Sequence, residues 1–401
     1  MRKRGDSMSF SFPKLNFSNP LQKAWGLWGL LIFTAIMSSV ASHFHRSVIY
    51  AYRSGALNWL HGFPLYDATG KGFIYFPQAA ILYIPFALLS PPLNMIVWCF
   101  VSVGFFAGGI LKLLEFLPEK QRASFFLVMT AVAAPIAFSD ARNGQMNLIM
   151  LALLCFTANS LGKFRWNEAT FLMVLAVALK PLSLILIFPF LLIYPSLIGR
   201  FIIGMGALWG IPFFLQSPHY VWQQYMAMFQ MLETASQVGT LDATHWAQLF
   251  NVLAQCHWFL SPTAQSVWRW GALGLLCGVS YYCRKNRGPL EAPFWILLLA
   301  VNYLLLFNPR TENNTYAILA PFIGYFMAHS FFIENNKKKT LFYLVQALGI
   351  LFAFNLSGWI IKGQTSWVTP FMGILFTLSA LLHLFRPSNS YREVEPSRHF
   401  G

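Results

Sequence analysis

Charged residues are scarce in this chain. Only 10% of its residues are Asp, Glu, Lys or Arg and 57% are hydrophobic, whereas soluble proteins are about 25% charged. This balance excludes an ordinary soluble protein of two or three domains, which the length alone would suggest. No stretch rich in Pro, Gly or Ser separates two halves. The composition therefore predicts one membrane-embedded domain.

The usual motifs for cofactors and metals are also missing. The five cysteines contain no Cys-x-x-Cys pair, so they predict no disulfide framework. The chain has no Asp-x-Asp motif of the kind that holds a metal-bound diphosphate donor. His43 and His45 are close enough to share a metal but have no evident third ligand. We therefore expect no cofactor and no metal.

Acidic residues are outnumbered by basic ones. The chain has 28 Lys and Arg against 13 Asp and Glu, a formal charge of +15. A nucleic-acid-binding protein would gather this charge on one soluble patch. Here the basic residues recur in loop after loop, which is typical of proteins with many spans that keep Lys and Arg on the cytoplasmic side. The pattern predicts contact with membrane lipids and no nucleic-acid partner.

Apolar runs are what the chain has in abundance. A helix needs about 20 residues to cross a bilayer, and many runs approach that length. The candidate spans are 25–42, 94–113, 123–139, 147–161, 169–180, 182–197, 200–215, 264–282, 290–308, 315–333, 340–358 and 368–385. They predict an all-α integral membrane protein with about 12 transmembrane helices. Its bundle would occupy residues 25–385, between cytoplasmic tails at 1–24 and 386–401.

One further apolar stretch, Phe73–Ser90, is predicted not to cross. If it crossed, the later basic clusters would move to the outer side, against the positive-inside rule. Prolines interrupt it, and a proline inside a helix costs about 3 kcal/mol. We expect interfacial helices here, within a first outer loop at 42–93, and another in a second outer segment at 216–262. Both chain ends are then cytoplasmic.

Carboxylates are few on the predicted outer side, and three of them stand in short polar islands beside spans. The first island surrounds Asp67, the second is Ser139–Asn147 and the third is Asn308–Tyr316. Helix capping alone could explain such residues. Chemistry on a sugar phosphate would need a carboxylate as general base, cations for the phosphate, and amides and aromatics for the sugar. The islands, together with Lys180, supply all of these.

The candidate site residues fall into three groups. The possible catalytic carboxylates are Asp140, Asp67 and Glu312. The cations that could hold a donor phosphate are Lys180, Arg142 and Arg310, although Lys180 could also snorkel to the membrane surface. The side chains that could contact the sugar or the acceptor are Gln145, Asn147, Tyr75, Tyr66 and Asn314.

Several motifs together resemble glycosyltransferase family 87. They are Trp59–Asp67 with Phe73–Pro77, Gly144–Asn147 before a span, the Lys180-Pro181 hinge, and Asn308–Arg310. Their order resembles the family over roughly residues 42–326. The resemblance implies a GT-C fold and a polyprenyl-phosphate donor carrying mannose or another hexose. It also implies inverting transfer to a lipid or glycan acceptor, on the periplasmic side of a bacterial inner membrane.

The chain departs from the family pattern in two places. The family usually has an Asp just after the first span, where this chain reads His43–Arg53 without a carboxylate, and its late motif usually ends in histidines. The identity of the base therefore stays open. Two other functions also stay open: a transporter or lipid flippase, although such folds place polar sites near the midplane, and a non-catalytic lipid-binding protein.

Overall fold

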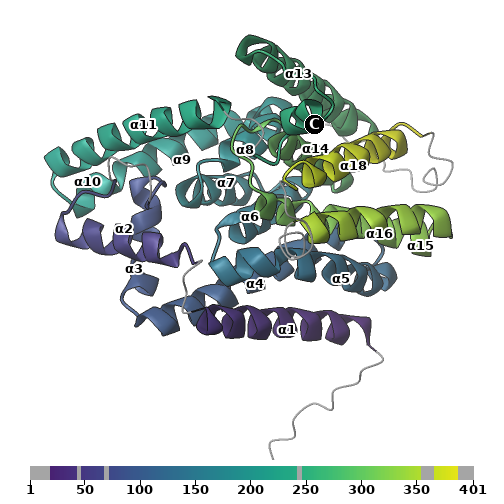
Figure 1. Ribbon diagram of the computed structural model, residues 1–401, viewed down its shortest axis with the longest axis horizontal. Helices are drawn as coiled ribbons and strands as arrows, with labels where there is room; N and C mark the ends of the chain where they lie inside the picture. The colour runs from purple at the N-terminus through teal and green to yellow at the C-terminus, as the bar shows by residue number, and fades with distance from the viewer. Residues whose placement is uncertain (1–18, 43–46, 67–71, 242–245, 354–364, 387–401) are drawn as a thin grey trace, which may run out of the picture.

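The architecture is entirely helical in the part of the chain that the structure describes. The computed structural model describes residues 19–42, 47–66, 72–241, 246–353 and 365–386. Within these ranges every regular element is a helix (Figure 1). Lipid offers no hydrogen-bond partners, so a backbone in the bilayer must satisfy its own polar groups, which a helix does. The prediction of an all-α membrane protein is confirmed.

Each predicted span coincides with helical structure in its described residues; residues 354–358 of the span at 340–358 lie outside them. The corresponding helices are α1 (Pro20–Ala41), α4 (Pro91–Leu113), α5 (Glu119–Asn143), α6 (Asn147–Gly162), α7 (Trp166–Leu179), α8 (Ser183–Ile193), α9 (Ile198–Gly210), α10 (Pro212–Leu215), α13 (Pro262–Asn286), α14 (Glu291–Phe307), α15 (Ala320–Phe332), α16 (Lys337–Leu351) and α18 (Val368–Leu384). The 3-10 turns are η1 (Leu114–Phe116), η2 (Pro195–Leu197) and η4 (Asn313–Ile318).

Helix length leaves the number of crossings open. In the described residues, five helical segments are long and apolar enough to cross a membrane: Pro20–Ala41, Pro91–Phe116, Glu119–Asn143, Pro195–Leu215 and Asn313–Phe332. Several other apolar helices have only 10–17 residues, including α6, α7 and α14. The count of twelve spans stays a prediction.

The stretch that was expected not to cross forms a short helix. It is α3 (Pro77–Ala87), which follows α2 (Ile49–His61) in the same loop. Its 11 residues rise only about 16 Å at 1.5 Å per residue, whereas the hydrocarbon core is about 30 Å thick. By itself α3 is too short to span, but α8 also has only 11 residues, so the non-crossing of this stretch stays a prediction. The second long loop also contains helices, α11 (Pro218–Leu241) and α12 (Leu249–Gln255).

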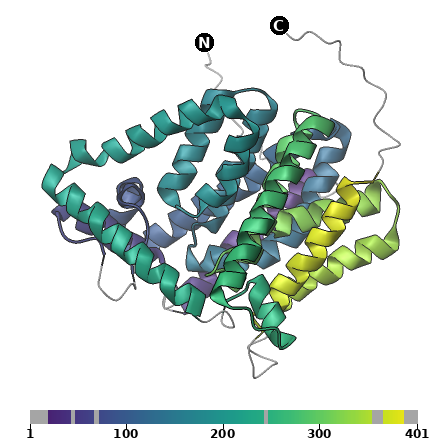
Figure 2. The same ribbon diagram turned by 90° about the horizontal axis from the view of Figure 1, so that it is seen from above.

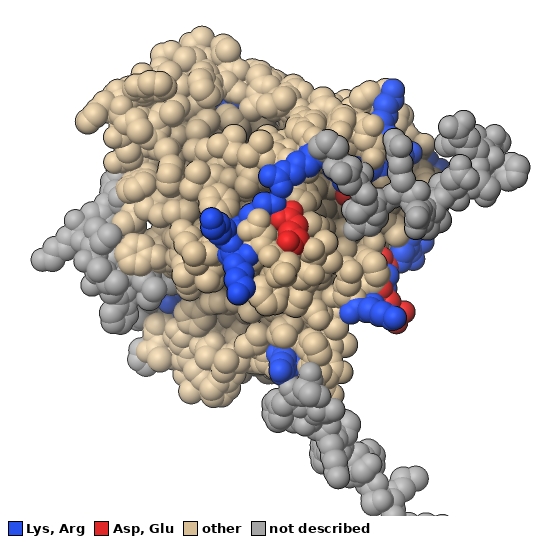
Figure 3. Space-filling view, turned by 90° about the vertical axis from the view of Figure 1, so that its right-hand side faces the viewer, with Lys and Arg blue, Asp and Glu red and all other residues tan. Residues whose placement is uncertain are grey.

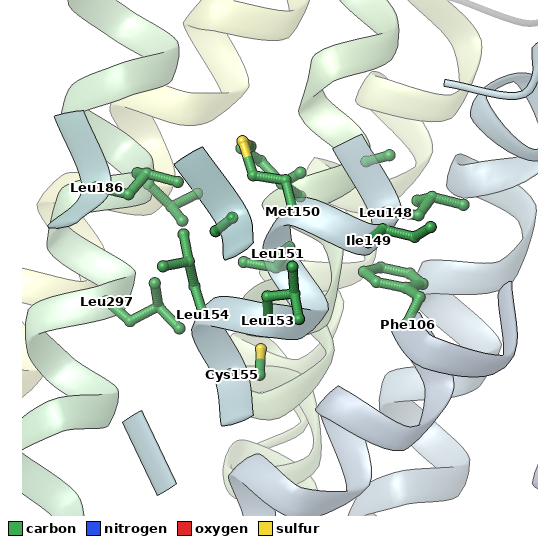
Figure 4. Packing of buried hydrophobic residues seen from close by; sticks show 14 of the residues in the cluster. Phe106, Leu148, Ile149, Met150, Leu151, Leu153, Leu154, Cys155, Leu186 and Leu297 are labelled. Atoms are coloured by element: carbon green, nitrogen blue, oxygen red, sulfur yellow. The ribbon is translucent and has the colours of Figure 1, made fainter. Parts of the chain in front are cut away.

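The centre of the bundle is α6, which is buried on every side. Each of its residues except Phe156 is buried, as expected for a helix that is hydrophobic all round. Figure 4 shows its side chains packed among Phe106 of α4, Leu186 of α8 and Leu297 of α14. Towards the periphery, α9 and α11 lie at one end of the molecule and α16 and α18 at the other (Figures 1 and 2).

Small residues allow neighbouring helices to approach closely. A Cβ added to Gly109 of α4 would lie 2.8 Å from the Cα of Ala152 of α6. A Cβ added to Gly324 of α15 would lie 2.6 Å from the Cα of Met129 of α5. Apolar surface is not driven together in lipid, so such close van der Waals contact is a main source of helix association.

One end of the bundle is rich in charged side chains. Lys and Arg side chains, with a few acidic ones, gather on the face where α1 begins and α15 gives way to α16 (Figure 3). At this end Glu115 pairs with Lys112 and Lys163 and accepts from Asn159 at 2.9 Å, which joins the ends of α4 and α6. The opposite end of α5 carries Asp140.

Replacing Gly324 with Ala should destabilise the protein, because the new methyl group meets backbone that cannot move aside. We expect the thermal unfolding midpoint of Gly324→Ala in detergent to fall by several degrees. Gly104→Ala is the control, because a Cβ there meets nothing within 4 Å. Equal midpoints for the two variants would contradict the close α5–α15 contact.

Candidate active site

The site is organised by the tight turn between α5 and α6. Gly144 caps α5 with φ +72°, in the left-handed region that favours glycine. A Cβ at this position would also lie 2.4 Å from Cγ1 of Ile49. Trp98 fixes the turn by donating from Nε1 to the Gly144 carbonyl at 3.0 Å. The turn therefore places Asp140, on the last turns of α5, beside Asn147, the first residue of α6.

Three polar side chains form a continuous chain of hydrogen bonds at this end of the bundle. Asn147 Nδ2 donates to both carboxylate oxygens of Asp140, at 3.2 and 3.4 Å. Lys180 Nζ, just after α7, donates to Asn147 Oδ1. Asp140 and Asn147 are each only 1% exposed. A charge buried so deeply needs an opposite charge and hydrogen-bond partners, and Asn147 joins the two charges by using both ends of its amide.

Glu312 and Tyr75 complete this cluster. Glu312 interacts electrostatically with both Asp140 and Lys180, although it lies far along the chain. Glu312 is exposed whereas Asp140 is buried, so the cluster reaches from the protein interior to solvent. The structure thus brings together candidates from all three of the groups expected from the sequence.

Tyr75 adds a hydroxyl that stays protonated. Burial raises the pKa of Tyr75 to about 12; the hydrogen bond between Tyr75 and Tyr52 opposes the rise, and the charges of Glu312 and Asp140 add to it. The two hydroxyl oxygens of Tyr52 and Tyr75 are 3.1 Å apart. Tyr66 supports the same loop, because its hydroxyl donates to the Tyr75 carbonyl at 2.6 Å. Tyr75 can therefore donate a hydrogen bond at any physiological pH.

The other two candidate cations lie in different surroundings. Arg142 donates to Asn143 Oδ1 at 3.1 Å and to Ser139 Oγ at 3.3 Å, and its guanidinium lies 5.7 Å from the centre of the Phe138 ring. Two residues along a helix turn the side chain by about 200°, so Arg142 and Asp140 leave α5 on nearly opposite sides. Arg310 is exposed, with its guanidinium 5.2 Å from the centre of the Trp246 ring.

The remaining candidates are placed as follows. Gln145 lies in the turn itself, where its backbone N–H donates to the Asp140 carbonyl at 2.9 Å. Asn314 is buried in η4 and accepts from Thr315 Oγ1 at 3.4 Å. Asp67 lies outside the described residues.

Sequence reasoning missed one cation of the first outer loop. Arg53 of α2 has a buried Nε that hydrogen-bonds to nothing among the residues that the structure describes. Its charge interacts with the hydroxyl of Tyr83, a neighbour of Tyr52. The sequence offered one indication of this cation: Arg53 is the last residue of the segment His43–Arg53, which contains no carboxylate that could pair with it. A buried N–H without a partner is costly, which marks the half-buried Arg53 as a group that could receive an anion.

An apolar groove runs along α7 to the neighbourhood of Lys180. The groove has a volume of about 590 Å³ and lies between α3, α7 and α9. Gln78 and Ala178 line one end, and Ala178 is two residues from Lys180. Asn167 and Arg200 line the other end, where Arg200 Nε donates to Asn167 Oδ1 at 3.0 Å. Apolar side chains line most of the groove, so its lining suits a long apolar chain.

These features define the class of protein: an α-helical membrane protein with an ionic site at one end of the bundle and an apolar groove between α3, α7 and α9. Residues 73–309, more than half of the chain, match glycosyltransferase family 87. The chain belongs to this family and is therefore a membrane glycosyltransferase. No curated protein matches it. The matched segment contains Tyr75, Asp140, Asn147 and Lys180, whereas Glu312 lies just beyond it.

Replacing Asn147 with Leu should destabilise the fold, because it leaves both Asp140 and Lys180 without their bridging amide. Each unsatisfied buried group costs about 1–3 kcal/mol, and more when it is charged. The unfolding midpoint of Asn147→Leu should fall clearly below that of the wild type. Asn286→Leu is the control, because Asn286 is exposed and bonds only within its own helix turn. An unchanged midpoint for Asn147→Leu would show that the bridge contributes nothing.

Proposed function

We propose that this chain transfers a hexose, such as mannose, from a polyprenyl-phosphate donor to a lipid or glycan acceptor. The reaction takes place at the outer face of a bacterial inner membrane, with both chain ends in the cytoplasm. The observation that carries the proposal is the buried chain of Asp140, Asn147 and Lys180. It combines a carboxylate, an amide and a cation within one membrane glycosyltransferase.

The charge distribution supports the assignment of sides. Basic side chains gather where α1 begins and α15 gives way to α16, and cytoplasmic segments are the ones rich in Lys and Arg. Asp140 is near the far end of α5 from Glu119, which begins that helix. If the basic face is cytoplasmic, the cluster belongs to the outer side. A lipid-linked sugar presented there needs no nucleotide-sugar domain.

In the proposed reaction, the Asp140 carboxylate takes the proton of an acceptor hydroxyl as general base. The hydroxyl oxygen bonds to the anomeric carbon while the bond from that carbon to the phosphate oxygen breaks. Polyprenyl phosphate leaves with the electron pair, and Lys180 stabilises its negative charge. Attack opposite to the leaving group would invert the anomeric centre.

The hydrogen bonds within the cluster are of a kind that substrates can replace. The bonds from Asn147 to Asp140 are shared between two oxygens and are long, at 3.2 and 3.4 Å, so each is weaker than a single well-aligned bond. An acceptor hydroxyl can replace one of them at little cost. Lys180 can likewise exchange the neutral Asn147 oxygen for a phosphate, which is the stronger partner. Exposed Glu312 and the Tyr75 hydroxyl would contact the sugar at the mouth of the site.

The groove beside α7 fits the lipid part of the donor. Apolar side chains line most of it, and it ends two residues from Lys180. An isoprenoid chain in a bilayer gains no hydrophobic energy by leaving lipid, so binding must come from van der Waals fit. In the proposal, such a groove orients the isoprenoid chain, and the phosphate would lie beyond its Gln78 and Ala178 end.

Asp140→Asn should abolish transfer, because the amide cannot accept the proton. With purified protein and a panel of radiolabelled polyprenyl-phosphate sugars, we expect the rate to fall by about 10²–10⁴-fold. Glu312→Gln should retain more activity, because its proposed role is contact with the sugar.

Glu168→Gln is the matched control, because Glu168 forms an exposed pair with Arg165 at the start of α7. A product that persists in Asp140→Asn and vanishes in Glu312→Gln would assign the base to Glu312. Wild-type protein that binds the donors but yields no product would favour a flippase or a lipid-binding protein.

Lys180→Gln should weaken the interaction with the donor phosphate. A hydrogen bond to a charged group contributes about 1.5–3 kcal/mol, so we expect kcat/KM for the donor to fall about 10- to 100-fold. Part of the loss should appear in donor binding measured without acceptor. Lys163→Gln is the control, because Lys163 pairs with Glu115 at the opposite end of α6. Unchanged donor binding and turnover in Lys180→Gln would remove Lys180 from the site.

A further inference from the structure

A second cluster of ionisable side chains lies at the basic end of the molecule. It is formed by His329 of α15, Glu334 in the turn after α15, and His383 of α18. One nitrogen or oxygen atom from each of the three lies within 4.8 Å of the others. Glu334 Oε1 is 3.7 Å from His329 Nδ1 and 3.6 Å from His383 Nδ1. A single carboxylate oxygen thus faces both imidazoles.

These distances suit a shared metal better than direct hydrogen bonds. Hydrogen bonds from nitrogen to oxygen usually measure about 2.7–3.2 Å. In a tetrahedral zinc site, ligand bonds of about 2.0–2.2 Å separate neighbouring donor atoms by roughly 3.4 Å. Two imidazoles and one carboxylate are also a common zinc ligand set, with a fourth position left for water. Imidazole favours such transition metals over Mg²⁺ or Ca²⁺.

The surrounding residues hold the three side chains in place. The His383 ring stacks on Trp295 at 6.1 Å and meets the edge of Phe326 at 5.3 Å. The two histidine rings are 4.8 Å apart and nearly perpendicular. Lys339 donates to Glu334 Oε2, which leaves Oε1 turned towards the imidazoles. A metal-binding carboxylate is commonly oriented in this way by a hydrogen bond to its second oxygen.

Nearby cations are already engaged. Arg287 donates to Glu291 Oε1 at 3.2 Å and to the Leu384 carbonyl at 2.6 Å. Lys339 is held by the Glu334 oxygen that faces away from the imidazoles. A pocket of about 260 Å³ borders the cluster and is lined by His383, Lys339 and Arg386 among others. It offers an entry route for a metal ion and space for a fourth ligand.

We propose that His329, Glu334 and His383 bind a zinc ion that fastens α18 to the turn between α15 and α16. The site lies at the end opposite Asp140 and is independent of the proposed transfer reaction. A metal that binds only the folded protein stabilises it in proportion to the logarithm of its concentration, so we expect zinc to stabilise the fold. It adds a cross-link between helices that are distant in the sequence.

The test uses the full-length protein in detergent, stripped with a chelator and titrated with Zn²⁺ and, separately, with Co²⁺. We expect about one equivalent of zinc per chain by elemental analysis, a rise in the unfolding midpoint with zinc, and the visible absorption of four-coordinate Co²⁺ with nitrogen and oxygen ligands. His329→Gln and His383→Gln should each weaken zinc binding by at least tenfold and lose the rise in midpoint.

The control is His219→Gln, because His219 is exposed on α11; it should behave as the wild type. Wild-type protein that takes up no stoichiometric zinc would overturn the proposal. So would zinc binding that is unchanged in both variants of the cluster. If a variant fails to fold, the zinc stoichiometry and the cobalt spectrum of the wild type still decide the matter.

Discussion

The cost of burying charge in an apolar bundle is the constraint on which this structure depends. Asp140 is 1% exposed, and a carboxylate in such surroundings is tolerated only with partners. Its partners come from the start of α6 and the residue after α7. The end of α5, the start of α6 and the end of α7 must therefore lie at the same level in the bundle, with these three side chains turned inward. The tight turn at Gly144 and the break at Lys180-Pro181 are the local features that make this possible.

The same constraint explains why α6 is so completely buried. α6 carries Asn147, and only a helix fixed from every side can hold an amide between two charges at hydrogen-bond distance. Close contacts such as Gly109 against Ala152 provide that rigidity, because interhelical packing in lipid rests on shape. The apolar core and the polar cluster therefore depend on each other, because the packing of the core fixes the positions of the buried polar side chains.

Much of this could be predicted from the sequence, within a definite physical limit. Apolar runs and prolines predicted the helices and the short α3. One polar island contains Asp140 and Asn147, and the Lys180-Pro181 hinge between two apolar runs pointed to Lys180. What a sequence does not give is the rotation of each helix: Arg142 stands two residues from Asp140 yet leaves α5 on another side. The group of His329, Glu334 and His383 was missed for a related reason. His383 is distant in the sequence from His329 and Glu334, so no spacing motif predicts that the three residues lie together.

Charge balance in the cluster bears on how a donor could bind. Two carboxylates, Asp140 and Glu312, share a single lysine, so the three groups together are negative when the carboxylates are ionised. A phosphate brought to Lys180 would add further negative charge at short range, which is unfavourable in a low dielectric. A further cation would offset this charge, and the first outer loop contains Arg53, whose buried Nε has no hydrogen-bond partner in the described part of the chain. In the proposed reaction the first outer loop would then supply a cation, at the segment where related enzymes usually place their aspartate.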